Sequence, residues 1–311
     1  MSNLRASFVT VDVFTDHAFG GNQLAVFPDA TDIPEELLLP IAREFNYSEV
    51  TFCYPPADEN HTRRVRIFTP GGEVPFAGHP TIGTAHVLVA TGAVKARGSA
   101  VDLVLEEGVG PVPVHVELGG GEPVFARLSV AKLPEIGPQP PSRGVLAEIL
   151  SLEASDIGFG GQGPQAISCG LPFLIVPVRD VAAVSRARVR VERWEATLQS
   201  YWARDVMVFA TDPSGGPSHF RARVFVPGFS VPEDPATGSA NACLAGYLAL
   251  RAPETDESFV WTVDQGIEMN RASRLRIEAD KQAGTITAIR VGGTSVIVSE
   301  GIMRLPEQAV S

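Results

Sequence analysis

The stretch FVPGFSVPEDPATGSANACL, residues 225–244, leads from a strand-like run through a turn rich in proline, glycine and acidic residues into a run of small apolar residues. The pattern predicts a helix that begins near Pro235 and continues to about Arg251. Proline is favoured at the first helical position because its missing N–H would have no partner there. Glu233 and Asp234 directly precede this helix. They belong either to an ordinary acidic helix cap or to an active site.

A stretch of similar pattern, RVRIFTPGGEVPFAGHPTIGTAHVL, occurs about half a chain earlier, at residues 64–88. It aligns with residues 221–244 at an offset of 157 as far as Pro75 and Pro232, and at an offset of 155 after a two-residue slip. Matches in the same order at a nearly constant offset predict a duplicated domain of about half the chain. The alignment pairs Arg64 with Arg221, Pro80 with Pro235, His79 with Asp234, Gly83 with Gly238 and Thr84 with Ser239.

The duplication predicts the domain organisation. We expect an N-terminal half over residues 1–130 and a C-terminal half over residues 145–294, each combining strands with a helix. Residues 131–144 are rich in proline and glycine, which favours a linker between the halves. For the strand near residues 295–311 we keep open a return to the first half.

The composition is that of a globular rather than a disordered protein, with 44% hydrophobic and 20% charged residues in a chain of 311. The net charge of −11 argues against nucleic acid and anionic membranes as partners and favours a small molecule. The N-terminus lacks the pattern of a signal peptide. Cys53, Cys169 and Cys243 form no CxxC pair, so we expect reduced thiols in a cytoplasmic protein.

The two aligned turns differ in what they imply. Aspartate is a preferred N-cap, so Asp234 taken alone is most simply a cap. Histidine is not a preferred cap, so His79 needs another reason to stand before a proline. Two helix starts related by duplication would face each other across a cleft, where free N–H groups suit a substrate carboxylate or a developing enolate. Close backbone approach and hydroxyl donors would come from Gly78, Gly83, Gly238, Thr84 and Ser239.

The sequence contains no convincing motif for a metal or a cofactor. His79 and His86 stand seven residues apart with no third ligand at metal spacing, so we expect no metal site. The GFGGQG stretch at residues 158–163 precedes a strand-like run rather than a helix, which argues against a dinucleotide. We therefore expect no cofactor.

Five motifs identify a family. VDVFTDHAFGGNQLAVF, FNYSEVTF, FTPGGEVPFAGHPTIGTA, PEDPATGSA and QGIEMNRAS occur in this order over nearly the whole chain. Together they resemble the phenazine-biosynthesis isomerase (PhzF-like) family, a relative of diaminopimelate epimerase. The resemblance implies an α+β fold of two pseudo-symmetric domains, each a β-sheet curled around a central helix, with the active site between the halves. It also implies that no cofactor is needed and that the protein is commonly a homodimer.

The resemblance also implies particular site residues. It assigns a general acid/base to Glu49 in NYSEVTF, together with His79 in AGHPT and Asp234 in EDPATGS. The pattern alone would not single out Glu49, because a glutamate at a strand start is usually solvated. Its aromatic neighbours Tyr47 and Phe52 would desolvate the carboxyl and suit it to move a carbon-bound proton. The expected substrate-binding residues are Asn22, Ser48, Gly78, Gly83, Thr84, Thr237, Gly238 and Ser239.

Two departures from related patterns narrow the chemistry. Diaminopimelate epimerase uses a cysteine at each of its two helix starts. Here the places of those two cysteines carry Gly78 and Asp234, which disfavours a two-thiol racemase. Gln23 stands where the PhzF-like family commonly has the proline of a GNP motif, which would alter one edge of the pocket.

These observations predict a cytoplasmic, cofactor-independent isomerase. It would move a proton between carbons of a small carboxylate-bearing substrate, with a dihydroaromatic acid or an amino acid as candidates, through acid/base catalysis by Glu49. An epimerase, a racemase or a lyase on the same scaffold begins with the same proton removal, so these remain alternatives. A non-catalytic small-molecule-binding protein with this fold is a further alternative.

The purified protein should carry no stoichiometric metal, flavin, nicotinamide or pyridoxal group, because acid/base chemistry by side chains needs none. Elemental analysis and an absorption spectrum of the protein as isolated test this. A bound chromophore or a stoichiometric metal ion would contradict the expected mechanism.

Overall fold

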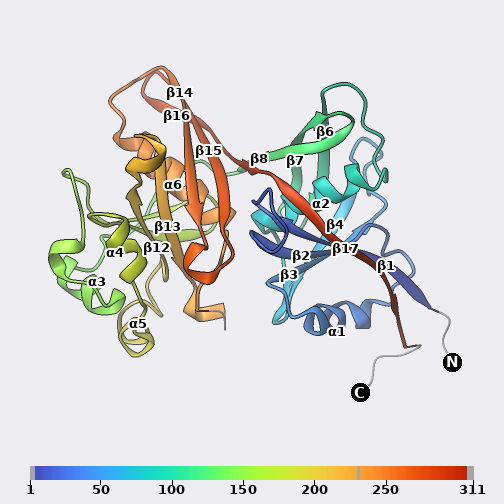
Figure 1. The fold of residues 1–311 in the computed structure, drawn as a ribbon, viewed down its shortest axis with the longest axis horizontal. Coiled ribbons are helices and arrows are strands. Elements are labelled where there is room, and N and C mark those ends of the chain that lie inside the picture. Colours follow the sequence, from blue (N-terminus) through green and yellow to red (C-terminus); the bar gives the residue numbers. More distant parts are fainter. Residues whose placement is uncertain (1–3, 230–231, 307–311) are drawn as a thin grey trace. The chain divides into compact units, whose positions relative to one another are not determined.

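The computed structural model describes residues 4–229 and 232–306, so Ser230 and Val231 of the quoted turn and residues 307–311 of the expected last strand lie outside the described residues. The chain divides into two compact units (Figure 1). Unit 1 comprises residues 1–129 and 292–311, and unit 2 comprises residues 130–291. Both mix strands and helices, which is the expected α+β class.

Unit 1 is a mixed β-sheet with the order β17-β1-β2-β3-β4-β6-β7-β8. The pairs β2–β3 and β4–β6 are parallel and the other pairs are antiparallel, while β5 forms a short hairpin with β4. The C-terminal strand therefore pairs with the first strand of the chain. The strands are β1 (Arg5–Val13), β2 (Asn22–Phe27), β3 (Glu49–Tyr54), β4 (Arg63–Thr69), β5 (Gly72–Val74), β6 (Ala100–Glu107), β7 (Gly110–Gly119), β8 (Glu122–Ser129) and β17 (Ser295–Arg304).

Helix α2 (Gly78–Ala90) forms the centre of unit 1. Every residue from His79 to Val89 is buried, and the helix contacts strands β1, β2, β3, β7, β8 and β17. A helix that is apolar on all sides is stable only inside a core. Helix α1 (Glu35–Phe45) packs its Leu38 and Ile41 with Phe27 and Phe52 in a separate apolar cluster of the same sheet. Strands β2 and β3 are thus buried on both faces, which explains their continuous apolar runs.

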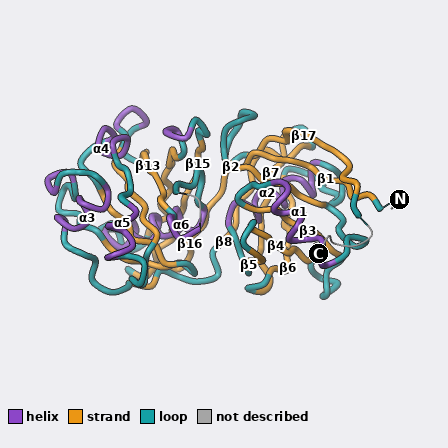
Figure 2. Tube along the Cα trace, turned by 90° about the horizontal axis from the view of Figure 1, so that it is seen from below, coloured by secondary structure: helices purple, strands orange, loops and turns teal. Residues whose placement is uncertain are grey.

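Unit 2 repeats this plan around helix α6 (Gly238–Arg251), which contacts β10, β11, β14 and β15. Figure 2 shows the strands of each unit gathered about its central helix. The strands are β9 (Glu135–Ile136), β10 (Gln165–Ser168), β11 (Pro172–Pro177), β12 (Asp205–Thr211), β13 (His219–Phe225), β14 (Glu257–Gln265), β15 (Ser273–Gln282) and β16 (Thr285–Gly293). The other helices and 3₁₀ turns are α3 (Arg143–Leu150), α4 (Val181–Arg186), α5 (Val191–Thr197), η1 (Ala154–Asp156), η2 (Pro213–Gly215), η3 (Pro227–Phe229) and η4 (Ile267–Met269).

The strand pairing confirms the duplication. Strands β1, β2, β3, β4, β6 and β7 pair successively antiparallel, parallel, antiparallel, parallel and antiparallel. Strands β10 to β15 pair in the same sequence of directions. Even the register repeats, because Arg64 lies opposite Glu106 and its aligned partner Arg221 lies opposite Asp264.

The expected alignment of the two helix starts is wrong. Helix α2 begins at Gly78 and α6 at Gly238, an offset of 160 rather than the expected 155. Pro80 therefore lies inside the first turn of α2, whereas Pro235 precedes α6 altogether. The connection between strand and helix is longer in the second copy, residues 226–237 against residues 70–77, and surface connections tolerate such insertions.

The corrected offset changes which residues correspond. Gly78 corresponds to Gly238 and His79 to Ser239, so His79 is not the counterpart of Asp234. The side chains at the next turn agree with this offset. Thr81 Oγ1 lies 2.8 Å from the Ala77 carbonyl oxygen, and Asn241 Nδ2 lies 2.9 Å from the Thr237 carbonyl oxygen, at the same place in each helix.

Residues 131–144, expected as a linker, are partly structured. Strand β9 pairs antiparallel with β10, with Ile136 opposite Ile167, and α3 begins at Arg143. A proline-rich segment still forms short edge pairings where its remaining N–H groups allow them. Within residues 4–229 and 232–306, no helix is long and apolar enough to cross a membrane.

Gly83 should be essential for the packing of α2. A Cβ atom there would lie 2.6 Å from Val13 Cγ2 and 2.7 Å from Leu24 Cδ2. We expect Gly83→Ala to lower the free energy of unfolding by about 1–3 kcal/mol through overpacking, despite the better helix propensity of alanine. The control is Gly144→Ala in the exposed first turn of α3, which should raise it by about 0.5–1 kcal/mol. Denaturant unfolding measures both, and equal effects would contradict the packing argument.

Candidate functional site

Three elements of unit 1 bring the expected residues of the first half together. Asn22 begins β2 and Glu49 begins β3, and these strands run parallel with Leu24 opposite Glu49. His79 is the second residue of α2, which packs on both strands. Ser48 directly precedes β3. Because β2 and β3 are parallel, both strands begin at the same end of the sheet, beside the start of α2.

A chain of polar contacts links these four residues. Ser48 Oγ donates to Asn22 Oδ1 at 3.4 Å, and Asn22 Nδ2 lies 3.2 Å from His79 Nδ1. The other ring nitrogen, His79 Nε2, lies 3.3 Å from Glu49 Oε2. The Glu49 side chain is 17% exposed and that of His79 is 6% exposed. Glu49 is thus more accessible to solvent or a ligand than His79.

The buried imidazole is uncharged. Burial lowers the pKa of His79 to about 3, and a hydrogen bond with the Gln23 backbone opposes this only in part. At neutral pH the contact with Glu49 is therefore not an ion pair. A neutral imidazole does not neutralise the charge of a neighbouring carboxylate.

Gly83 and Thr84 lie deeper in unit 1 than expected. Gly83 faces Val13 and Leu24 in the core. Thr84 is fully buried, and its hydroxyl bonds that of Thr51 on β3 at 2.8 Å. Both residues were assigned to the site by the alignment that paired them with Gly238 and Ser239. Their contacts indicate a packing role within the sheet.

In unit 2 the structure overturns the simple interpretation of Asp234 as a helix cap. The N-cap of α6 is Thr237, and Asp234 forms an extended bridge with Val224, to whose carbonyl its N–H donates at 3.0 Å. The Asp234 carboxylate accepts a hydrogen bond from the Thr237 hydroxyl. The carboxylate therefore stands ahead of the first turn of α6, with Gly238 and Ser239 just beyond it.

Gln265, which sequence reasoning missed, holds this turn together. Its Nε2 donates to the Asp234 carbonyl oxygen at 2.8 Å and lies 3.1 Å from Thr237 Oγ1. Its Oε1 accepts from Asn241 Nδ2 at 2.9 Å and from the Thr237 N–H at 3.3 Å. A further weak similarity in the sequence, between VLEEGVG at residues 104–110 and TVDQGIE at residues 262–268, pairs Gln265 with Glu107 and could have found it.

Glu233 has a structural rather than a catalytic partner. Arg223 on β13 donates to both Glu233 carboxylate oxygens at 2.7 Å, and its third nitrogen bonds the Ala187 carbonyl at 2.7 Å. Such bidentate pairs are strong and directional. In unit 1 the aligned Arg66 binds Glu73 in the same bidentate way, at 2.7 and 2.6 Å. The pair therefore anchors the segment immediately before Asp234.

Neither central helix uses a side-chain cap. Ala77 has no polar side chain to offer, and the Thr237 side chain accepts no N–H of the first turn of α6. The first N–H groups of a helix have no intrahelical partner and favour negative charge nearby. Gly78 and Gly238 are the first residues of these turns, so each helix start presents backbone donors suited to an anionic group.

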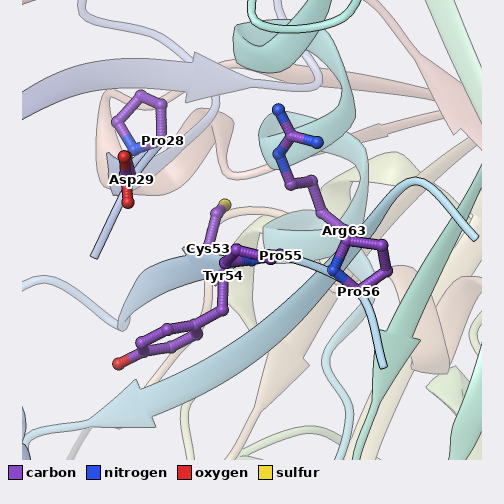
Figure 3. A pocket seen from close by; sticks show the side chains of 7 residues that line it. All are labelled: Pro28, Asp29, Cys53, Tyr54, Pro55, Pro56 and Arg63. Carbon is purple, nitrogen blue, oxygen red and sulfur yellow. The ribbon is translucent and has the colours of Figure 1, made fainter. Parts of the chain in front are cut away.

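A pocket elsewhere in unit 1 lacks comparable chemistry (Figure 3). It lies at the far end of β3 from Glu49, roughly 17 Å away along the strand. Burial raises the pKa of the Cys53 thiol to about 12, so it is no nucleophile at neutral pH. Within the described residues, no three His, Cys, Asp or Glu side chains are grouped to hold a metal ion. The lining residues are Pro28, Asp29, Cys53, Tyr54, Pro55, Pro56 and Arg63.

His79 should remain neutral throughout the range in which an ordinary histidine titrates. Its ring proton resonances should stay constant from pH 5 to 7, because burial holds its pKa far below 6.5. The unfolded chain does gain a proton there, so His79 lowers stability as pH falls from about 6.5 towards 3. Proton NMR, with the resonance assigned by its loss in His79→Asn, measures this. A midpoint near pH 6.5 would contradict the buried geometry.

Comparisons with known proteins agree over almost the whole chain. Residues 11–301 match the family model "Phenazine biosynthesis-like protein". The chain is 38% identical over 299 residues to an uncharacterized isomerase of Mesorhizobium japonicum, covering 95% of this chain and 97% of that protein. It is 32% identical over 294 residues to the trans-2,3-dihydro-3-hydroxyanthranilate isomerase of Pseudomonas aeruginosa, covering 94% and 98%.

Solved structures agree on the fold. A PhzF-family phenazine biosynthesis protein of Bacillus anthracis has a TM-score of 0.86 at 24% identity, covering 97% of this chain and 100% of that one. The fold alone is shared with an epimerase and a probable racemase that are each 13% identical. This confirms the expected diaminopimelate epimerase-like architecture. The chain therefore belongs to the phenazine biosynthesis-like protein family, as an isomerase of the PhzF type.

Proposed function

We propose that this isomerase moves a proton between carbons of a small carboxylate-bearing substrate without a cofactor, and that Glu49 is the group that carries the proton. The observation that supports this best is the Glu49 carboxylate 3.3 Å from the Nε2 atom of a buried, neutral His79. A general acid/base must reach the substrate and be held in one orientation. Partial exposure meets the first requirement, and the contacts through His79, Asn22 and Ser48 meet the second.

The proposed isomerisation is a proton transfer that leaves the atoms and electrons of the substrate unchanged in number. Glu49 removes a proton from one carbon, the electron pair moves into an adjacent π-system, and the same carboxyl returns the proton to another carbon. Negative charge develops on the substrate during this step. The N–H groups at the start of α2, where Gly78 is the first helical residue, are suited to stabilise it.

Asp234 is assigned to binding the substrate. Its turn is held by Gln265, by the Thr237 hydroxyl and by the Arg223–Glu233 pair. Such support is typical of a functional group that must keep one geometry. A helix cap is no longer an alternative role for this carboxylate, because Thr237 is the N-cap of α6.

The substrate class follows the Pseudomonas aeruginosa relative. That protein is named as an isomerase of trans-2,3-dihydro-3-hydroxyanthranilate, and it is 32% identical to this chain. We propose a cyclic dihydroaromatic amino acid of this kind. A two-thiol epimerase is less well supported, because the residues at and after the N-caps are Ala77, Gly78, Thr237 and Gly238.

Substitution at Glu49 tests the proton carrier. Incubation with trans-2,3-dihydro-3-hydroxyanthranilate in deuterium oxide should give an isomer that carries deuterium at carbon. Glu49→Gln should lower the rate by at least about 10²-fold, the low end for general acid/base catalysis, because an amide cannot take up the proton. The control is Glu36→Gln at an exposed position of α1, which should leave the rate unchanged. A fully active Glu49→Gln protein would refute the proposal.

Asp234→Asn tests the role of the second carboxylate. The amide oxygen can still accept from the Thr237 hydroxyl, so the melting temperature should stay within about 2 °C of that of the wild type. Loss of the negative charge should nevertheless reduce turnover. Unchanged kinetics with unchanged stability would remove Asp234 from the site.

A further inference from the structure

Helix α2 has a second polar contact near its start, on the side of strand β6. Thr81 Oγ1 lies 2.8 Å from the Ala77 carbonyl oxygen and 2.7 Å from Glu107 Oε1. Glu107 is the last residue of β6 and is 8% exposed. The neighbouring Glu106, by contrast, accepts backbone N–H groups of Ala57 and Asp58.

The number of protons decides the ionisation state of Glu107. A threonine hydroxyl has one proton, and the Ala77 carbonyl can only accept. A threonine within a helix commonly bonds the carbonyl four residues back, as Thr81 does with Ala77. The short contact with Glu107 then needs a proton from the carboxyl group. The three oxygens are Thr81 Oγ1, the Ala77 carbonyl oxygen and Glu107 Oε1. If Glu107 were ionised, the single hydroxyl proton could serve only one of the two contacts, and the other contact would have no proton.

Unit 2 shows the same arrangement with the second proton supplied by an amide. Asn241 donates one N–H to the Thr237 carbonyl and the other to Gln265 Oε1, both at 2.9 Å. Gln265 is the last residue of β14, as Glu107 is of β6. A protonated glutamic acid has nearly the shape of glutamine. Each side chain ends in one donor group, O–H or NH₂, and one carbonyl oxygen that accepts.

The surroundings of Glu107 favour the neutral form. Burial raises its pKa from 4.5 to about 8, and the Thr81 hydrogen bond opposes this only in part. Among the described residues, its Oε2 atom is buried and has no hydrogen-bond partner. No described cation bonds its carboxyl group. The titratable groups on the same strand and on the surrounding elements are Asp102 and Glu106 on β6, His79 and His86 on α2, Glu49, Cys53 and Tyr54 on β3, Arg63, Arg64 and Arg66 on β4, Glu73 on β5, and His115 and Glu117 on β7.

These neighbours do not offset a negative charge on Glu107. Burial lowers the pKa of His86 to about 4, and His79 and the Cys53 thiol are also neutral at pH 7. Arg63 bonds the Thr62 and Ala93 carbonyls, and Arg66 bonds Glu73. Ionised Glu107 would therefore be a buried charge without compensation.

We propose that Glu107 is a neutral carboxylic acid in the folded protein and that, through Thr81, it positions the first turn of α2, which carries His79. Glu107 is then a positioning residue, and its ionisation at alkaline pH withdraws the proton that joins β6 to α2. The direction in which stability changes with pH follows from the raised pKa of Glu107. The unfolded chain ionises Glu107 above pH 4.5 while the folded chain resists, so this group lowers stability as pH rises from 4.5 to about 8.

Infrared spectroscopy tests the ionisation state directly. The wild type at pH 6 should show the carbonyl stretch of a protonated carboxyl group that is absent from Glu107→Gln and present in Glu106→Gln. In the wild type, and equally in Glu106→Gln, this band should disappear with a midpoint near pH 8. The wild-type titration does not depend on any variant folding. If no band is lost in Glu107→Gln, Glu107 is ionised and the proposal is overturned.

Thermal melts test the effect on stability. Glu107→Gln should match the wild type at pH 5 and melt at least about 5 °C higher at pH 8, because the amide cannot ionise. Glu106→Gln is the matched control, since hydrogen bonds from Ala57, Asp58 and His61 lower the pKa of Glu106 to about 2. That variant should be destabilised at neutral pH. A Glu107→Gln protein that is less stable than the wild type at pH 8 contradicts the proposal.

The ring resonances of His79 test the positioning role. In the wild type they should shift between pH 7 and 9.5 with the midpoint of Glu107, although His79 itself stays neutral. In Glu107→Gln they should not shift over this range. A change in overall stability alone would not move them below the melting temperature. Identical behaviour in the two proteins would remove Glu107 from the positioning of His79.

Discussion

A helix that is buried on every side must have the polar side chains of its first turn satisfied from within the core. This constraint acts on α2 and on α6 alike, because both are enclosed by strands of their own unit. It explains the small residues in both helices, and Gly83 in particular, whose missing side chain makes room for Val13 and Leu24. It also explains why a polar side chain at the end of the neighbouring strand reaches the first turn in each unit.

The duplicated scaffold carries different chemistry in its two copies. In unit 1 the parallel strands β2 and β3 place Asn22 and Glu49 beside His79. In unit 2 the longer connection from strand to helix adds a segment that carries Asp234. An arginine at the aligned position, Arg66 or Arg223, holds a carboxylate of this connection in both copies. The shared framework therefore preserves the support, while loop length and residue type decide which functional group stands at the helix start.

Environment, more than residue type, sets the charge of the acidic groups. Glu106 and Glu107 are neighbours in β6, yet hydrogen bonds from backbone N–H groups lower the pKa of the first and burial raises that of the second. His79 shows the same effect for a base, since burial makes it neutral beside a partly exposed carboxylate. The contact between the two groups is therefore polar without being an ion pair.

The internal repeat determined the duplication, because matching residues recur at a nearly constant offset, and the family resemblance implied the α+β class. The repeat did not determine where the two helices begin: Pro80 and Pro235 carry the same local signal, but side-chain bonds of Thr81 and Asn241 to strand ends fix the starts at Gly78 and Gly238. Glu49 was found through family resemblance, since its contact with His79 depends on the pairing of β2 with β3. The roles of Glu107, Gln265 and Arg223 arise only from burial and from partners distant in the chain, which tertiary structure alone decides.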